Sequence, residues 1–295
     1  LPPSAFKLAD AEGNELSASE GIRVPAGDFS AKIMVKVGQL NSKDFPANKK
    51  YAIPLSITGA SNYSLIPSQR SAILLLNRSI LSSVAKVSGG EGIRIKPVGM
   101  HTKAEWTIQM SAIYSSLTRS NLTTAYLSNG TGGEFYTRIS STAGIQVKNG
   151  RDGDDTWTQI PLQAGKWLHI TYVHKDKKTT VYVNGKVQKV FENSAITFGE
   201  NSMIVVGNSG YRNDYLREIR LWDKALTESE INDYLYLPMD PATPHLISYL
   251  PLSKEMETKD LKAPAGTENV TTKARIEYVE NVKFPADELV IVNQE

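Results

Sequence analysis

The feature that most constrains the fold is the alternation of apolar and polar side chains between Gly165 and Val190, in GKWLHITYVHKDKKTTVYVNGKVQKV. A period of two is typical of β-strands that bury one face. A charged turn at 175–178 and the Asn184-Gly185 pair interrupt the alternation. The second of these supplies the positive φ angles that a two-residue hairpin turn needs. The segment therefore predicts three antiparallel strands joined by two turns.

Strand signals of the same kind dominate the rest of the chain. One series ends near Asn77, and a second, longer series begins beyond Gly90. Turn signals recur about every 8–12 residues, as expected of an all-β sandwich. We interpret 78–90 as the joint and predict two all-β domains, residues 1–82 and 83–295.

One short helix is predicted in the second domain. Thr227 is followed three residues later by Glu230, which is the spacing of a capping box. Leu226 before the cap and Ile231 after it form a hydrophobic staple. We expect Thr227 to cap the only well-formed helix of this domain.

Composition narrows the classes of function. The 295 residues include 33 basic and 31 acidic side chains, for a net charge of +2 without a basic stripe, so nucleic acid is not an expected partner. The chain has no cysteine, which excludes disulfides, thiolate catalysis and Cys-ligated metal sites. Its 4 histidines show no H-E-x-x-H or other ligand spacing, so zinc hydrolysis has no support.

Several motifs occur in order across residues 88–237. They are GGEGIRI, EWTIQMSAIY, GKWLHITYVHKDKKTTVYVNGKV and IVVGNSGYRNDYLREIRLWDKALTESEI. Together they resemble the laminin-G/concanavalin-A-like jelly-roll family in its bacterial form. The resemblance implies two stacked antiparallel sheets, with function grafted onto the concave face and the rim loops. It also implies that Trp106, Trp167 and Trp222 belong to the core.

The first eighty residues resemble the small Ig-like N-terminal domain of unknown function found in Bacteroidetes surface lipoproteins, through the order VPAGDFSAKIMVKV, KKYAIPLSI and AILLLN. That family has a further strand before the point where this chain begins, so we expect a truncated N-terminus. The expected fold is all-β, with a small Ig-like β-sandwich followed by a concanavalin-A-like (laminin-G-like) jelly-roll sandwich. The pairing implies a lipid-anchored outer-membrane protein at the cell surface or in the periplasm, attached to the membrane only through a lipid anchor that this chain lacks.

Carboxylate spacing gives no support for catalysis. Some jelly rolls of this shape are glycoside hydrolases with an E-x-D-x-x-E strand, which places two carboxylates on one face. That strand does not occur here, because Glu218 and Asp223 are five residues apart and fall on opposite faces, and Glu134 stands alone. We assign no catalytic residues and expect a protein that is not an enzyme.

A structural calcium ion is the one cofactor that the sequence suggests. The segment NGRDGDDTW places Asp152, Asp154 and Asp155 in one glycine-containing loop, and calcium prefers carboxylate and carbonyl oxygens. The EF-hand pattern fails because its twelfth position, counted from Asp152, is Gln163. The alternative is an Asx-rich turn without a metal.

Two segments have the composition of a sugar-binding surface, which combines aromatic rings with hydrogen-bonding side chains. The predicted ligand-binding residues are Tyr211, Arg212, Asn213, Asp214, Tyr215, Arg151 and Trp157. We expect these two segments to converge on one rim of the jelly roll. The alternative is that Tyr215 and Trp157 are half-buried strand ends, with the site then on the concave sheet around Tyr136 and Arg138.

The sequence and its resemblance favour a non-catalytic, cell-surface carbohydrate-binding protein of a glycan-utilisation system. Its partners would be an oligo- or polysaccharide and other outer-membrane glycan-uptake proteins. One alternative is a protein-interaction or scaffold module of an outer-membrane complex. A second is a glycoside hydrolase whose catalytic carboxylates are dispersed along the chain.

Overall fold

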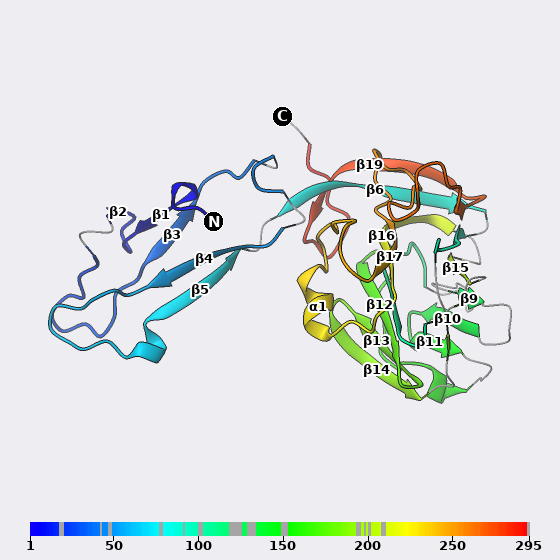
Figure 1. Ribbon diagram of the computed structural model, residues 1–295, viewed down its shortest axis with the longest axis horizontal. Coiled ribbons are helices and arrows are strands. Elements are labelled where there is room, and N and C mark those ends of the chain that lie inside the picture. The colour runs from blue at the N-terminus through cyan, green and yellow to red at the C-terminus, as the bar shows by residue number, and fades with distance from the viewer. Residues whose placement is uncertain are drawn as a thin grey trace. The chain divides into compact units, whose positions relative to one another are not determined.

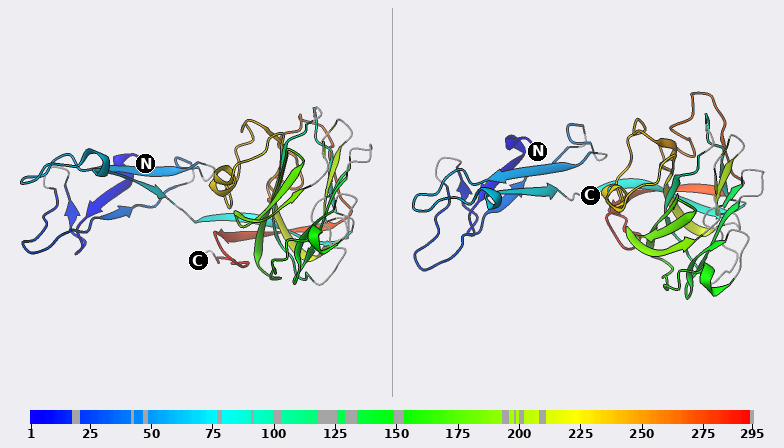
Figure 2. Two further views of the ribbon diagram at one scale, coloured as in Figure 1. Left: turned by 90° about the horizontal axis from the view of Figure 1, so that it is seen from below. Right: turned by 60° about the horizontal axis from the view of Figure 1, so that its bottom comes forward.

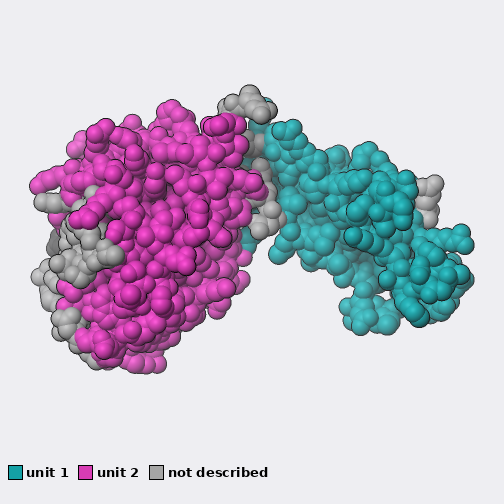
Figure 3. Space-filling view, turned by 180° about the vertical axis from the view of Figure 1, so that it is seen from behind, with its two compact units in different colours: residues 1–78 teal, residues 79–295 magenta. Residues whose placement is uncertain are grey.

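The computed structural model describes most of the chain in two units, residues 1–78 and 79–295, which are coloured separately in Figure 3. The described residues are 1–17, 21–41, 43–46, 49–76, 79–90, 92–99, 103–117, 126–128, 134–148, 153–192, 196–197, 199, 202–207 and 211–293, without the side chains of 126–128, 134 and 211. No helix within these ranges is both long enough and apolar enough to cross a membrane.

The first unit consists of two small antiparallel sheets. A three-stranded sheet has the order β2-β1-β3, and a two-stranded sheet pairs β4 with β5. The strands are β1 (Phe6–Ala9), β2 (Glu15–Leu16), β3 (Met34–Val37), β4 (Tyr51–Ser56) and β5 (Ser71–Leu76), with short 3-10 turns η1 (Pro3–Ala5) and η2 (Pro67–Gln69).

The segment that the sequence indicates as a joint is a strand of the second unit. β6 (Ile80–Gly89) pairs with β16 on one side and β19 on the other. Its serines and terminal glycines have loop-like composition, but Val84 and Val87 are fully buried. Pairing on both edges decides its conformation here, as tertiary context commonly does for strands. The first unit therefore ends at 78, a few residues before the expected boundary at 82.

The second unit is a sandwich of two antiparallel sheets (Figures 1 and 2). One sheet has the order β11-β10-β9-β15-β7-β18 and the other β14-β13-β12-β8-β16-β6-β19, with β17 paired to β16. The six-stranded sheet comprises β7 (Ile93–Ile95), β9 (Tyr126–Ser128), β10 (Glu134–Ser140), β11 (Gly144–Lys148), β15 (Met203–Val206) and β18 (Val270–Thr271). The eight-stranded sheet adds to β6 the strands β8 (Trp106–Ile113), β12 (Trp167–Lys175), β13 (Lys178–Val183), β14 (Lys186–Glu192), β16 (Tyr211–Trp222), β17 (Leu246–Leu250) and β19 (Arg275–Phe284).

The meander that the sequence predicts is β12-β13-β14. Asn184 and Gly185 have φ angles of 51° and 75°, so the two-residue turn is confirmed. One face of the meander enters the main core through Leu168, Ile170 and Tyr172. The core between the sheets is built from alternate residues of nearly every strand, as expected when two pleated sheets pack face to face.

Helix α1 (Glu228–Asp233) begins at the predicted cap. The Thr227 hydroxyl accepts from the Glu230 backbone N–H, and the Glu230 carboxylate accepts from the Thr227 backbone N–H. Leu226 and Ile231 are buried in a second, smaller cluster against the other face of the eight-stranded sheet. The predicted capping box is confirmed, and the buried pair anchors the helix as the staple requires.

Candidate functional site

The predicted segment Tyr211–Tyr215 is the beginning of strand β16 rather than a loop. It pairs with the end of β6, and the register shifts between Arg212 and Asp214. Asn213 has a φ of 60° at this bulge, which only a few residue types adopt readily. Arg212 and Asn213 are exposed and Tyr215 is half-buried, whereas the Tyr211 side chain lies outside the described part of the structure.

Asp214 has a structural role in this segment. Its side chain is 2% exposed. Oδ1 accepts from the Ser115 backbone N–H at 2.7 Å and from the Ser115 hydroxyl at 2.9 Å, and Oδ2 accepts from the Arg212 N–H at 3.1 Å. The carboxylate closes the bulge and holds the end of β8 against β16, so its hydrogen-bonding capacity is used within the fold.

The second predicted segment lies along the edge of the six-stranded sheet. Arg151 and Asp152 fall outside the described residues. Asp154 and Asp155 are exposed in the 3-10 turn η3 (Asp154–Thr156), and Trp157 follows it in extended conformation. Trp157 forms an antiparallel bridge with Gln146 of β11.

A glycine allows this segment to lie against β11. Gly144 closes the β10–β11 hairpin with a φ of 79°. A Cβ at this position would lie 2.4 Å from the Ile160 carbonyl oxygen, far inside contact distance. The Thr158 N–H donates to the Ile145 carbonyl at 2.9 Å and continues the pairing.

The structure does not bring the two predicted segments together. The Trp157 segment is attached to Lys189 of edge strand β14, four strands away from β16 in the eight-stranded sheet. Neighbouring strands are about 4.8 Å apart. The residue pairs that lead from Lys189 across the sheet end at Leu221 of β16. Tyr215 lies nearer the start of that strand. Trp157 and Tyr215 are therefore far apart both across the strands and along them, so the described residues do not show the expected convergence on one rim.

The segment instead joins a set of side chains on the outer face of the six-stranded sheet, which we call the outer face. Trp157 pairs with Gln146, and Gln146 pairs with Arg138 of β10. Residues directly opposite one another in antiparallel strands point to the same side. Tyr136 and Lys148 form the next row. The intervening residues of both strands, such as Phe135 and Val147, face the core.

Two polar atoms of the outer face lack a partner among the described residues. They are Nε of Arg138, a donor, and Oε1 of Gln146, an acceptor, both shielded from solvent. Gln146 is 2% exposed and uses its amide N–H to donate to the Thr156 hydroxyl at 2.8 Å. The Arg138 guanidinium lies 5.4 Å from the centre of the Tyr136 ring. Unpaired buried polar atoms are uncommon in folded proteins and call for a ligand, water or strain as explanation.

Lys189 connects the edges of the two sheets next to this face. Its ammonium donates to the Trp157 carbonyl at 2.6 Å and to the Asp155 carbonyl at 2.9 Å. The same ammonium lies 5.1 Å from the centre of the Phe191 ring. The lysine thereby fixes the backbone that carries the Trp157 ring. Gln146 and Lys189 were not predicted, because only strand pairing far along the chain brings them beside Trp157.

The described residues contain no group of three or more carboxylate, histidine or cysteine side chains placed to hold a metal ion. Of the predicted calcium ligands, Asp154 and Asp155 are described and exposed. The Asp154 carbonyl already accepts from the Trp157 N–H and from the Gln159 amide. Two exposed carboxylates fall short of the 6–8 oxygen ligands typical of calcium. A calcium site here would need Asp152 as well.

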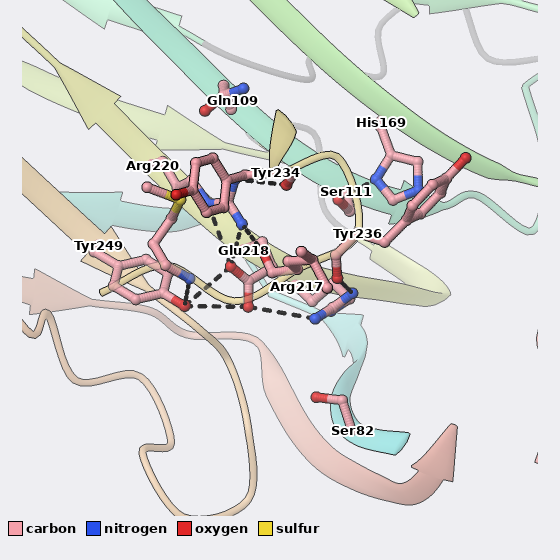
Figure 4. A network of polar contacts seen from close by, with 12 residues as sticks. Ser82, Gln109, Ser111, His169, Arg217, Glu218, Arg220, Tyr234, Tyr236 and Tyr249 are labelled. Carbon is pink, nitrogen blue, oxygen red and sulfur yellow. Dashed lines mark hydrogen bonds and ion pairs between the residues drawn. The ribbon is translucent and has the colours of Figure 1, made fainter. Parts of the chain in front are cut away.

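A buried ionic cluster lies on the face of the eight-stranded sheet that points away from the main core (Figure 4). Glu218, with a φ of 54° at a bulge of β16, accepts from Arg220 at 2.5 Å and from the Tyr249 hydroxyl at 3.0 Å, and Arg217 lies 3.4 Å away. The two guanidinium groups also donate to backbone carbonyls at Tyr234, Tyr236 and Leu237. The cluster thus attaches the segment after α1 to the sheet.

A Ser–His pair next to this cluster invites a catalytic interpretation. The Ser111 hydroxyl and His169 Nδ1 are 2.6 Å apart, both residues are buried, and the imidazole packs edge-on to the Tyr236 ring at 4.8 Å. Burial, followed by the charges of Arg217 and Arg220, lowers the pKa of His169 to about 3. An imidazole of that pKa is a weak base at neutral pH. The adjoining cavity is about 10 Å³, which is room for about one water.

The buried carboxylates of the described chain all have protein partners. Asp214 and Glu218 are held as described, and Asp260 accepts from the Ser248 hydroxyl at 2.6 Å and the Tyr249 N–H at 2.9 Å. A glycosidase presents two carboxyl groups, roughly 5–10 Å apart, to a bound sugar. These three serve the fold instead. Trp106, Trp167 and Trp222 are at most 5% exposed, which confirms their assignment to the core.

Comparisons with known proteins agree with this architecture. Residues 88–232, from the end of β6 into α1, match the family model described as the concanavalin A-like lectin/glucanases superfamily. A protein from Bacteroides ovatus ATCC 8483, to which carbohydrate binding is ascribed, is 18% identical and matches over 95% of this chain and 80% of its own, with a TM-score of 0.55. No curated protein matches the sequence.

Two further solved structures are more distant. A heptameric SAP-like pentraxin from Limulus polyphemus is 13% identical over 68% of this chain and 94% of its own, with a TM-score of 0.45. Domain 4 of an extracellular GH43 arabinanase from Geobacillus stearothermophilus, solved with arabinotriose, is 16% identical over 62% and 86%, with a TM-score of 0.41. The chain is an all-β protein whose second unit has a concanavalin A-like jelly-roll fold, similar across residues 88–232 to that family of lectins and glucanases.

Proposed function

We propose that this chain is a non-catalytic carbohydrate-binding protein whose site is the outer face around Tyr136, Arg138, Gln146 and Trp157. The observation that carries the proposal is a donor of Arg138 opposite an acceptor of Gln146, both without a partner among the described residues, beside two aromatic residues. A sugar hydroxyl both donates and accepts, so one hydroxyl can satisfy groups of either kind.

The chemistry of the face suits a saccharide better than an apolar ligand. Tyr136 and Trp157 are half-buried, so their rings are held in place while part of each surface stays open. Aromatic rings give contact area at low entropic cost, and the nearby polar groups provide orientation. A shallow face of this kind forms few buried contacts, so the expected affinity for one oligosaccharide is weak, on the order of micromolar to millimolar.

We further propose that the protein acts at the cell surface, anchored to the outer membrane by a lipid, as part of a glycan-utilisation system. Support comes from the resemblance of the first eighty residues to the N-terminal domain of Bacteroidetes surface lipoproteins. In that setting the protein would hold a polysaccharide near other outer-membrane proteins that take it up.

Affinity electrophoresis of the full chain through gels containing soluble polysaccharides tests the proposal. The panel comprises arabinan, xylan, galactomannan, alginate, polygalacturonate and hyaluronan. At least one is expected to retard the protein. Tyr136→Ala and Trp157→Ala should each abolish the retardation; because both rings are half-buried, the melting temperature should fall, but the variants should stay folded at the temperature of the gel. Tyr63→Ala, an 84% exposed tyrosine of the first unit, is the matched control.

Several outcomes would count against the proposal. Migration unaffected by every polysaccharide would refute carbohydrate binding within this panel. Loss of binding in Tyr211→Ala but not in Trp157→Ala would move the site to the start of β16. Release of reducing sugar from a retarding polysaccharide would show that the protein is an enzyme.

A further inference from the structure

We infer that the outer face selects acidic saccharides, with Arg138 pairing with a carboxylate of the sugar. The inference rests on the proposed function and specifies its ligand class. Arg138 is half-buried in the middle of β10, and the one ring or ionic interaction of its side chain among the described residues is with the Tyr136 ring, whose centre lies 5.4 Å from the guanidinium carbon. No described carboxylate is paired with it.

Three other arginines of the second unit have carboxylate partners. Arg217 and Arg220 are 1% and 3% exposed, and they share the Glu218 carboxylate. Arg275, on the surface, pairs with Glu277 at 2.6 Å. Removing a charge from water costs free energy that a counter-ion normally offsets. At Arg138 a ring contact provides only part of that compensation.

The guanidinium geometry indicates which counter-ion fits. Its planar fork donates two parallel hydrogen bonds to a carboxylate, and this pairing is stronger and more directional than a bond to a neutral hydroxyl. Stacking on Tyr136 holds the fork in position before a ligand arrives. Binding energy is then not spent on ordering a long side chain.

The neighbouring groups suit a carboxylate on a sugar ring. Gln146, directly opposite Arg138, has an acceptor without a partner among the described residues, and this oxygen can accept a hydrogen bond from an adjacent ring hydroxyl once the side chain turns toward the ligand. Lys148 occupies the next row of the same face. At the sheet edge the Lys189 ammonium is bound to two uncharged carbonyls, so its positive charge adds to the local potential. A hydroxy acid such as a uronic acid residue meets each of these requirements.

Polymers whose carboxyl groups are either free or esterified test the inference. We would compare polygalacturonate with its methyl ester, alginate with its propylene glycol ester and hyaluronan with its methyl ester, using affinity electrophoresis and isothermal titration calorimetry on the full chain. In at least one pair, the acid should bind at least about tenfold more tightly than the ester, since one charge-assisted interaction contributes that much.

Two arginine variants assign the selectivity to its residue. Arg138→Met should remove the preference for the acid and leave any binding of the ester unchanged. Arg138→Lys should retain only part of the preference for the acid. Arg212→Met, which removes an exposed arginine at the start of β16, is the matched control and should bind as the wild type does. Raising the salt concentration should weaken the binding of the acid more than the binding of the ester.

The possible results distinguish the selectivity for acidic saccharides from the proposed carbohydrate binding on which it rests. Esters or neutral polysaccharides that bind as tightly as the acids would overturn acidic selectivity and leave carbohydrate binding in place. Retained preference in Arg138→Met, or its loss in Arg212→Met, would overturn the role of Arg138. Failure of all acids to bind would likewise overturn the inference, and failure of every polysaccharide would remove the proposed function as well.

Discussion

At the scale of single residues, burial decides what the polar side chains of the second unit do. Asp214, Glu218 and His169 have the residue types of catalytic groups, yet each is enclosed and bonded within the fold. Within the described residues Arg138 Nε and Gln146 Oε1 have no hydrogen-bond partner, and neither does Nε2 of His169. The partnered carboxylates hold the architecture, whereas the outer face combines unpaired atoms with the half-buried rings of Tyr136 and Trp157.

His169 should make stability depend on pH. Its folded pKa is about 3, whereas an unfolded imidazole has a pKa of about 6.5. The unfolded chain therefore binds more protons between these values, and the contribution of His169 is fully present above pH 6.5 and decreases as the pH falls toward 3. His169→Gln should reduce the slope of unfolding free energy against pH between 5 and 6.5, measured by urea denaturation.

The remaining slope in that variant has an identifiable source. Burial lowers the pKa of His174 to about 4, so this imidazole acts in the same direction. The double variant with His174→Gln should be flatter still. A slope that His169→Gln leaves unaltered would show that the folded protein protonates this histidine.

At the scale of elements, local signals predict local structure well. The Asn184-Gly185 turn and the Thr227 capping box depend on residues within a few positions, and both are found as predicted. The bridge between Trp157 and Gln146, and the hydrogen bond from Lys189 to the Trp157 carbonyl, depend on the order of the strands in the sheets. The sequence does not reveal that order. Similarly, β6 was interpreted as a joint because its two partners lie more than a hundred residues downstream.

Lys189 should be a positioning residue for Trp157. Lys189→Met removes the two hydrogen bonds to the Asp155 and Trp157 carbonyls, so the Trp157 ring loses its fixed place and polysaccharide affinity should fall about tenfold. Fluorine NMR of 5-fluorotryptophan protein, with the Trp157 signal assigned from Trp157→Phe, should show a change at that signal alone.

A neighbouring lysine provides the control for this experiment. Lys186→Met alters an exposed residue of the same strand and should change neither the spectrum nor the affinity. If all four tryptophan signals move in Lys189→Met, the lysine supports the sandwich as a whole. If none moves, it does not position the ring.

At the scale of the whole molecule, the two-unit organisation predicts a stable proteolytic fragment. The second unit begins with β6, which is paired along both edges. Limited proteolysis should therefore release a fragment that starts near residue 79, identified by mass spectrometry. A fragment starting near Ser88, where the motifs that resemble the jelly-roll family begin, would lack most of β6 and contradict this arrangement.

Calcium should have little effect on the folded molecule. Asp154 and Asp155 are exposed, and the described chain assembles no cluster of ligands around them. An ion held only by the folded state raises the melting temperature by mass action. We expect equal melting temperatures in calcium and in EDTA. A clear rise with calcium would establish a site and bring Asp152 into it.

The position of β6 also has a mechanical consequence. A pull on the first unit reaches the second at the start of this strand, which is hydrogen-bonded to β19 along most of its length and to β16 over its second half, residues 85–89. Force along a strand loads its ladder bonds in shear, together, rather than opening them one after another. Single-molecule extension between the N-terminus and an attachment beyond the Gly89 end of β6 should therefore meet high resistance, whereas a pull at Phe284, which is paired with Ile80, would open the ladder one bond after another. If the chain is tethered through its first unit, as proposed above, this arrangement would let it hold a polymer under flow without being unravelled by the pull on the tether.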